Sequence, residues 1–310
     1  MGTIFDINIY SGYIVKGDLI GAIKYVKDCP EQIDVYTKYV NIFENEQPVN
    51  YEVSSVLNEI LGIYQQYYRE VFFLRLEKEE AENNLRKRLA TQFANKTASL
   101  DSLEENEILN AFRDEGLKFM GGKTGGYYGP YIWKSTEHIT YEVELPDGIQ
   151  SYPVIFLDDF IMLSWMDYLS FGKVTPGGWT TDDGIINCVK KSYNTESENF
   201  KVSLLKHEAQ HVRDLEMYKN ISSEDLEYRA KLVELIYSSK RNLLEKFIHE
   251  AGDAHGHSVA AKRIINEFRQ RTNLDVDLLV ELDVAQIQSI AQLLFTENTV
   301  EIGDVYVTDY

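Results

Sequence analysis

Four glycines between residues 121 and 126 divide the chain into regions with opposite local preferences. Before them, from about residue 18 to residue 112, apolar residues recur at three- and four-residue steps, and glycine and proline are scarce. That spacing predicts amphipathic helices. After them, aromatic and β-branched residues predominate from residue 127 to residue 160, interrupted by prolines and glycines, which predicts short strands and hairpins.

A second turn-forming cluster, residues 175–178, precedes one more predicted strand at residues 184–189. From about residue 197 the helical pattern returns. We therefore expect an α+β fold with a small antiparallel sheet between about residues 121 and 195. The domains we expect are a mostly helical N-terminal region, residues 1–118, and a second domain, residues 119–310.

Charge and cysteine content restrict the expected partners. With 50 acidic and 31 basic side chains the formal net charge is −19, which argues against binding of nucleic acid or of anionic membranes. The two cysteines, Cys29 and Cys188, lie far apart, so the sequence predicts neither a disulfide framework nor a cysteine metal site. No segment has the roughly 20 apolar residues of a membrane span, and residues 1–6 do not resemble a secretion signal. We expect a cytoplasmic protein.

The segment His-Glu-Ala-Gln-His at residues 207–211 is the strongest chemical signal in the sequence. Apolar residues at 204, 205, 212 and 215 predict that it lies on a helix with one buried side. Four residues span slightly more than one helical turn, so His207 and His211 project from one face about 6 Å apart along the axis. Such a pair can share one metal ion, and Zn²⁺ is the ion we expect.

Glu208 lies one residue further round the same helix than His207. This position leaves its carboxylate beside the metal, where it can take a proton from a water molecule that the metal polarises. The sequence therefore predicts Glu208 as the general base of a hydrolase.

A catalytic zinc ion needs a third protein ligand and an open coordination position. The metzincin arrangement would place glycine at position 214 and histidine or aspartate at 217, and Asp214 and Met217 exclude it. The alternative is a glutamate from a following helix, which the capping pattern beginning at Ser222 predicts. Glu227 is the best candidate because it lies one turn inside that helix, and Glu234 on the same face is the second choice.

These residues together resemble the gluzincin group of zinc metallopeptidases, the thermolysin-like superfamily, over roughly residues 202–258. The resemblance implies that a further histidine stabilises the oxyanion, in a stretch of the form His-x-Asn-Ser. The sequence Ala-His-Gly-His-Ser at residues 254–258 resembles this stretch, with His257 at the asparagine position. His255 is the expected stabilising residue, and His257 and a tyrosine such as Tyr193 are the alternatives.

The sequence also departs from the family pattern. Members often carry an aspartate four residues after the ligand glutamate that orients the first histidine, and this chain has Lys231 there. Asp214, three residues beyond His211, is a substitute on a nearby part of the helix face.

The resemblance implies a zincin-like metallopeptidase domain with an active-site helix and a helical C-terminal half. It also implies a peptide or protein substrate that pairs with the strand at residues 184–189. The alternative is a non-catalytic protein in which zinc links two helices and the N-terminal helices bind a partner. The sequence predicts no particular oligomeric state.

Overall fold

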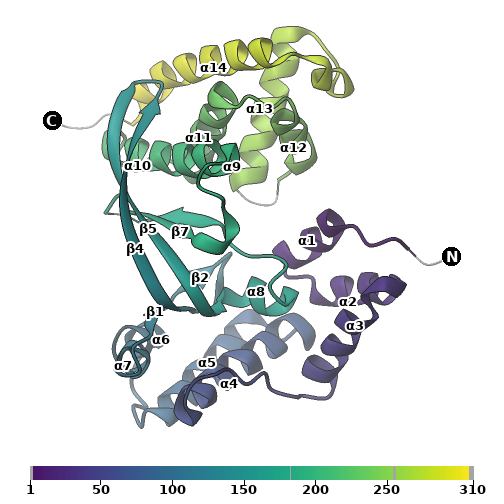
Figure 1. Cartoon of the computed structure of the whole chain (residues 1–310), viewed down its shortest axis with the longest axis vertical. Helices are drawn as coiled ribbons and strands as arrows, with labels where there is room; N and C mark the ends of the chain where they lie inside the picture. The colour runs from purple at the N-terminus through teal and green to yellow at the C-terminus, as the bar shows by residue number, and fades with distance from the viewer. Residues whose placement is uncertain (1–2, 182, 254–255, 307–310) are drawn as a thin grey trace. The chain divides into compact units, whose positions relative to one another are not determined.

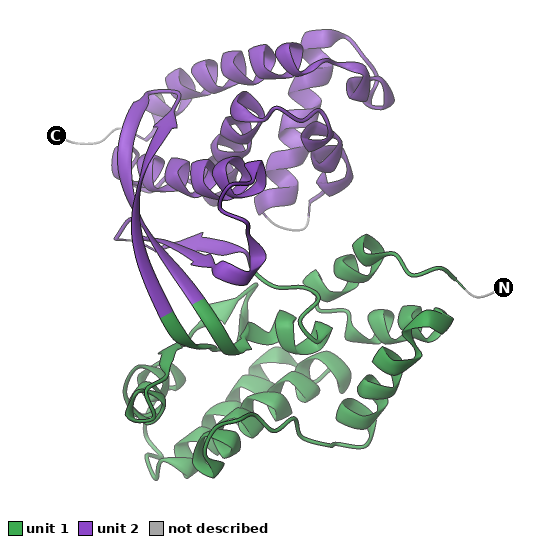
Figure 2. Ribbon diagram, in the orientation of Figure 1, with its two compact units in different colours: residues 1–135, 158–176 green, residues 136–157, 177–310 purple. Residues whose placement is uncertain are grey.

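The computed structural model describes residues 3–181, 183–253 and 256–306, and its fold is α+β, as the sequence predicts (Figure 1). The chain forms two compact units, coloured separately in Figure 2. Unit 1 comprises Met1–Ser135 and Asp158–Pro176, and unit 2 comprises Thr136–Leu157 and Gly177–Tyr310. Two of the three boundaries between the units fall within long strands, β4 (Tyr131–Leu145) and β5 (Gly148–Leu163), and the third lies between Pro176 and Gly177.

Unit 1 is mainly helical, which confirms the helical pattern before the glycine cluster. Its helices are α1 (Ile7–Val15), α2 (Leu19–Lys27), α3 (Ile33–Tyr39), α4 (Ser55–Tyr68), α5 (Lys78–Gln92), α6 (Leu100–Ser102), α7 (Leu109–Asp114) and α8 (Ser164–Ser170). Local sequence explains where α4 begins, because the Ser54 hydroxyl accepts a hydrogen bond from the Leu57 backbone N–H at 3.2 Å. Short strands follow the helices: β1 (Lys118–Met120), β2 (Lys123–Thr124) and β3 (Tyr127–Tyr128).

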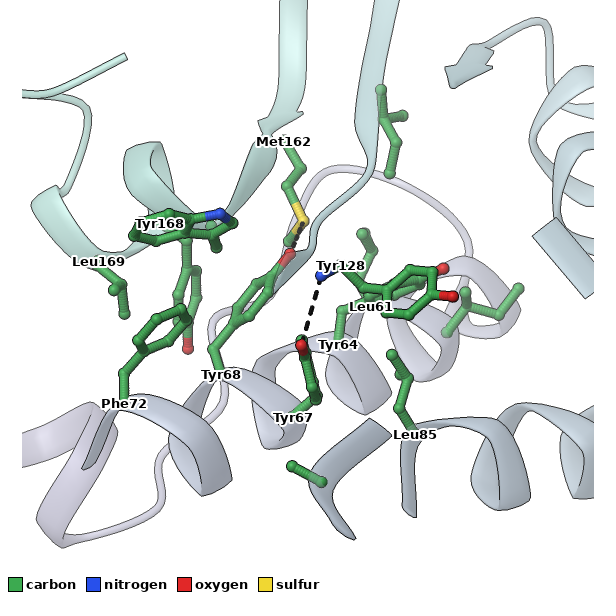
Figure 3. Packing of buried hydrophobic residues seen from close by; sticks show 14 of the residues in the cluster. Leu61, Tyr64, Tyr67, Tyr68, Phe72, Leu85, Tyr128, Met162, Tyr168 and Leu169 are labelled. Carbon is green, nitrogen blue, oxygen red and sulfur yellow. Dashed lines mark hydrogen bonds between the residues drawn. The ribbon is translucent and has the colours of Figure 1, made fainter. Parts of the chain in front are cut away.

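Tyrosines of α4 form much of the core of unit 1 (Figure 3). The Tyr68 hydroxyl points to the sulfur of Met162 on β5, 3.8 Å away, and the Tyr67 hydroxyl accepts from the backbone N–H of Tyr128 at 3.4 Å. Phe72 stacks on Trp165 of α8 with ring centroids 4.8 Å apart. These contacts join the helices of unit 1 to its strands through large buried rings.

The main sheet has the strand order β1-β4-β5-β7-β6, with β6 at Gly178–Thr180 and β7 at Ile186–Val189. The expectation of an antiparallel sheet is wrong, because β5 and β7 run parallel, with Val154 opposite Ile186. The chain between these two strands contains α8 and β6, and this long connection allows it to return to the starting end of β5. The sheet is therefore mixed.

The expectation that residues 184–189 accept a substrate as an added strand is also wrong. Within that segment β7 already has β5 on one side and β6 on the other. Because both of its edges are paired, its backbone has no free edge to offer a peptide. In the described part of the sheet, the edge next to β7 is formed by β6.

Unit 2 continues from β6 and β7 into helices, and this agrees with the helical pattern predicted after residue 197. Its helices are α9 (Glu198–Phe200), α10 (His207–Met217), α11 (Ser223–Tyr237), α12 (Asn242–Glu250), α13 (Gly256–Thr272) and α14 (Val284–Val305). The Ser222 side chain caps α11 by accepting from the backbone N–H of Asp225 at 3.0 Å, as its sequence pattern predicts. Among the described helices of both units, none combines the length and the apolar character that a membrane crossing needs.

Candidate metal centre

The two histidines of the 207–211 motif lie on α10, which begins at His207 directly after a π-helical segment, Lys201–Lys206. Ala209 and Val212 on the same helix are buried in the core of unit 2, so the helix is anchored on its apolar side. The rings of His207 and His211 have centroids 4.7 Å apart and are nearly perpendicular. The helical spacing therefore brings the two imidazoles together, as predicted.

Glu227 of α11 lies opposite the histidine pair. The Nε2 atoms of His207 and His211 are 3.0 Å apart. The carboxylate of Glu227 is 3.5 Å from Nε2 of His207 and 3.8 Å from Nε2 of His211. The side chains that the sequence names as ligands thus converge, one from each corner of a triangle.

The size of this triangle matches what a small tetrahedral cation requires. Metal–ligand bonds of about 2.0–2.1 Å at tetrahedral angles place neighbouring ligand atoms roughly 3.3 Å apart. The 3.0 Å between the two Nε2 atoms, the 3.5 Å from His207 to Oε2 of Glu227 and the 3.8 Å from His211 to its Oε1 lie around that value. His207, His211 and Glu227 therefore could hold one shared metal ion.

Glu234 occupies a different position from the one expected of an alternative ligand. Its Oε1 lies 2.8 Å from Nδ1 of His207, on the opposite side of the ring from Glu227. A carboxylate there accepts the Nδ1 proton, so the lone pair of Nε2 would face Glu227 and His211 once Nε2 gives up its own proton to a metal ion. Glu234 is two helical turns after Glu227, which puts both carboxylates on one face of α11.

The charges at the site favour a bound cation. Burial alone raises the pKa of Glu227, but hydrogen bonds from His207 and His257 outweigh it and hold that pKa well below its usual range. Burial also lowers the pKa of His207, but its contacts with Glu227 and Glu234 prevail and raise that pKa to about 10. Burial and the charge of His207 lower the pKa of His211 to about 3. The cluster therefore keeps one positive charge between its carboxylates, a place that a metal ion can take.

Glu208 lies between α10 and the edge strand of the sheet. The hydroxyl of Thr180 on β6 donates to its Oε2 at 2.7 Å. Burial raises the pKa of Glu208, and the charge of His207 and the hydrogen bond from Thr180 partly offset that rise. A partly buried carboxylate with a raised pKa accepts protons more readily near neutral pH than an exposed one.

The role expected of Asp214 is not supported by its contacts. Asp214 is fully buried, and its oxygens accept from Gln210 at 2.8 Å and from Arg229 at 2.9 Å. It therefore stabilises the packing of α10 on α11, and Glu234 provides the contact that orients His207. Lys231, at the position where the family often has an aspartate, donates to Glu250 at 2.8 Å.

Of the two histidines in the 254–258 segment, only His257 lies among the described residues. His255, the expected oxyanion-stabilising residue, lies outside the described residues. His257, its alternative, is half exposed at the start of α13, with its Nδ1 2.8 Å from Oε2 of Glu227. The ring of His257 lies 6.0 Å from that of His207, so it borders the cluster of His207, His211 and Glu227.

Sequence reasoning missed Thr180, and it named Glu234 as a second-choice ligand rather than as the residue that orients His207. Thr180 has no pattern of its own, because only the pairing of β6 with β7 places it beside Glu208. Glu234 did carry a signal, since its spacing from Glu227 puts it on the same helix face, but that spacing does not tell a ligand from an orienting group. Comparison with protein-family models, curated proteins and solved structures finds no match to this chain.

Proposed function

We propose that the protein is a zinc-dependent metallopeptidase with a zincin-like catalytic domain in unit 2. The observation that carries the proposal is the convergence of His207, His211 and Glu227 within distances suited to one ion, with Glu208 next in sequence to the first histidine. Two imidazoles and one carboxylate form a common ligand set of catalytic zinc. Structural zinc sites more often use four side chains, with cysteine prominent among them.

Zinc is preferred over harder cations because of the donor set. Mg²⁺ and Ca²⁺ favour oxygen ligands, whereas two imidazole nitrogens with one carboxylate suit zinc and its transition-metal neighbours. When bound, zinc would polarise a peptide carbonyl and make water more acidic. His207 and His211 would hold it as neutral donors, Glu227 would neutralise part of its charge, and Glu234 would keep the ring of His207 oriented.

Glu208 is the residue we assign to proton transfer. Its carboxylate accepts the proton of the attacking water and passes it to the amine that leaves when the peptide C–N bond breaks, so Glu208 ends in its starting state. The hydrogen bond from Thr180 fixes the carboxylate for this role. Among the residues that the structure describes, His257 is our candidate for donating a hydrogen bond to the carbonyl oxygen as charge develops there.

An extended peptide would be held along β6. This strand pairs with β7 through one edge, and Thr180 at its end contacts Glu208. Gly178 lets β6 lie close to β7 and to Leu204. A Cβ atom at this position would lie 2.5 Å from the carbonyl oxygen of Asn187 and 2.6 Å from Leu204. A peptide that adds to the outer edge of β6, the last strand in the described part of the sheet, would present a carbonyl to the Glu208 side of α10.

The test compares the natural protein with Glu208→Gln, using bound zinc and the cleavage of a mixed peptide library as the two readouts. We expect both forms to bind one equivalent of zinc. Cleavage by the variant should fall by about two orders of magnitude or more, because the amide cannot accept the proton. A Glu224→Gln variant, changed at an exposed position in the first turn of α11, should cleave like the natural protein.

The alternative, a zinc ion that only links α10 and α11, is favoured by the nearness of His257 to Glu227. In that case a fourth side chain would close the site. Zinc would then be retained by both the natural protein and Glu208→Gln, and neither would cleave any peptide. That result would contradict the peptidase proposal.

A further inference from the structure

A pocket of about 290 Å³ lies in unit 2 where the turn between β6 and β7 meets α10. It is lined by Thr181, Asp183, Gly184, Val212, Leu215 and Glu216. Its volume lies just below the range of pockets that hold whole cofactors or drug-sized ligands, which suits it to a single side chain. It does not include any of the metal-site residues.

The pocket is next to the catalytic face of α10. Val212 is one turn beyond Glu208 and Leu215 almost two, so the three side chains follow one face of the helix. Thr181 directly follows Thr180, whose hydroxyl contacts Glu208. At about 1.5 Å of rise per residue, the apolar wall lies roughly 6–10 Å along the helix axis from Glu208, within reach of a neighbouring side chain of a bound peptide.

The lining combines an apolar wall with an acidic rim. Val212 and Leu215 supply aliphatic surface, and Leu215 is 46% exposed although it is apolar. The carboxylates of Asp183 and Glu216 lie at the exposed margin. The nearby cation Arg213 is paired with Asp147 at 2.6 Å and lies 3.8 Å from Glu216, so two carboxylates flank one guanidinium.

Gly184 keeps the pocket open. Its φ of +79° is in the left-handed region, and a Cβ atom there would lie 3.2 Å from Val212. The turn is held by hydrogen bonds from the Thr181 N–H to the Ile185 oxygen and from the Gly184 N–H to the Thr181 oxygen, both 2.9 Å. A side chain at position 184 would strain this turn and project toward the apolar wall.

We propose that this pocket binds a lysine or arginine side chain of the peptide substrate and makes the enzyme selective for basic residues near the cleaved bond. The aliphatic part of such a side chain would cover Val212 and Leu215, and its cationic end would reach Asp183 and Glu216. This inference rests on the proposed peptidase function, because it assumes that a peptide lies along β6.

The test uses fluorescein-labelled hexapeptides that are alanine except at one position, which carries lysine, norleucine or glutamate in turn. Binding is measured by fluorescence anisotropy on the zinc-loaded full chain carrying Glu208→Gln, so that affinity is read without cleavage. Norleucine matches the aliphatic stem of lysine without its charge. At one peptide position we expect lysine to bind about three- to tenfold more tightly than norleucine, as two partly exposed carboxylates allow, and more tightly still than glutamate.

When Asp183→Asn and Glu216→Gln are added, the dissociation constants of the lysine and norleucine peptides should differ by no more than about twofold. The matched control adds Glu245→Gln and Glu281→Gln, two exposed carboxylates elsewhere in unit 2 with the same total change of charge. The control should keep the preference for lysine. Raising the salt concentration should weaken the preference in the parent and change it little in the pocket variant.

Three results would overturn the inference: no binding of any peptide, no preference for lysine, or a preference that survives the pocket substitutions. Cleavage of the same peptides by the natural protein separates this inference from the proposed function. Cleavage without a preference for lysine removes the pocket assignment and leaves the peptidase in place. A preference in binding without cleavage by the natural protein keeps the pocket and contradicts the peptidase.

Discussion

At the level of single residues, Glu234 determines which ring nitrogen of His207 faces the other candidate ligands. Its contact with Nδ1 fixes both the orientation and the tautomer of the ring. The same contact makes Nε2 a stronger metal ligand, because an imidazole whose Nδ1–H donates a hydrogen bond to a carboxylate is more basic at Nε2. The candidate metal site therefore extends one residue beyond its three candidate ligands.

Glu234→Ala should weaken zinc binding about ten- to hundredfold, the usual effect of removing such a partner. Glu234→Gln keeps an oxygen that can accept a hydrogen bond from Nδ1, so this variant should lose less zinc affinity than Glu234→Ala. Competition with a chelator of known affinity measures both. The exposed Glu224→Ala on the same helix is the control, and equal zinc affinity for Glu234→Ala and the natural protein would refute the orienting role.

Glu104 in unit 1 is a second buried carboxyl group with a testable consequence. It accepts hydrogen bonds from the Tyr64 hydroxyl and from the Gly122 N–H, but burial prevails and raises its pKa to about 7. A carboxyl group whose pKa is raised by folding binds its proton more tightly in the folded state. Its contribution to stability is therefore present below its unfolded pKa, near 4.5, and is lost as the pH rises through about 7.

We expect the unfolding free energy of unit 1 to fall by at most about 3 kcal/mol from this group between pH 4.5 and pH 8. Glu104→Gln should show a correspondingly flatter pH dependence. Trp133→Phe and Trp179→Phe leave Trp165 as the only tryptophan and thus as a reporter of unit 1 during denaturation. Parallel pH profiles for the two proteins would show that Glu104 does not titrate in this range.

At the level of elements, three helices of unit 2 are joined by one buried guanidinium. Arg229 of α11 donates to Asp214 of α10 at 2.9 Å and to Asn298 and Thr299 of α14 at 3.2 and 3.0 Å. The guanidinium also lies over the ring of Phe295, 4.2 Å from its centroid. This network fixes α11 against α10, and so the position of Glu227 relative to the histidines depends on it.

Asp214→Ala should lower the unfolding free energy by about 3–5 kcal/mol, because it leaves Arg229 buried without its carboxylate. Arg229→Met should be similarly destabilising. In the double variant the unfolding free energy should fall by less than the sum of the two single losses, since no unpaired charge remains. Urea denaturation followed by circular dichroism gives all three values, and a loss below about 1 kcal/mol for Asp214→Ala would show that the pair contributes little.

Local patterns in the sequence explain what was predicted among these elements. The 207–211 motif and the cap at Ser222 depend only on helical geometry, so the helices and the pairing of His207 with His211 follow from spacing. The approach of Glu227 also requires α11 to pack on α10, which spacing within a helix does not determine. The parallel pairing of β5 with β7 and the contact of Thr180 with Glu208 are set by the path of the chain. Apolar periodicity carries no information on strand order, and for that reason it could not reveal that the strand predicted to pair with a substrate, at residues 184–189, already has neighbours on both sides.

At the level of the whole molecule, all candidate metal ligands belong to unit 2. A ligand that binds only the folded state stabilises it by about 2.7 kcal/mol at a free concentration one hundred times its dissociation constant. That stabilisation should appear in the unit that contains the ligands. It should be strongest in α10 and α11, which supply them.

Removal of zinc by a chelator should therefore increase hydrogen exchange in α10 and α11, while α4 and α5 of unit 1 should change little. Mass spectrometry of peptides from the exchanged protein measures this difference. An equal change in both units, or a change confined to unit 1, would place the metal elsewhere in the chain.

We propose that two histidines of α10 and one glutamate of α11 hold a single zinc ion with a coordination position left for substrate. Anomalous diffraction at the zinc edge, from crystals of the zinc-loaded full chain, tests it most directly. We predict one peak about 2.0–2.2 Å from His207 Nε2, His211 Nε2 and an oxygen of Glu227. A peak elsewhere, or a peak whose fourth position is closed by a protein side chain such as His257, would contradict the account.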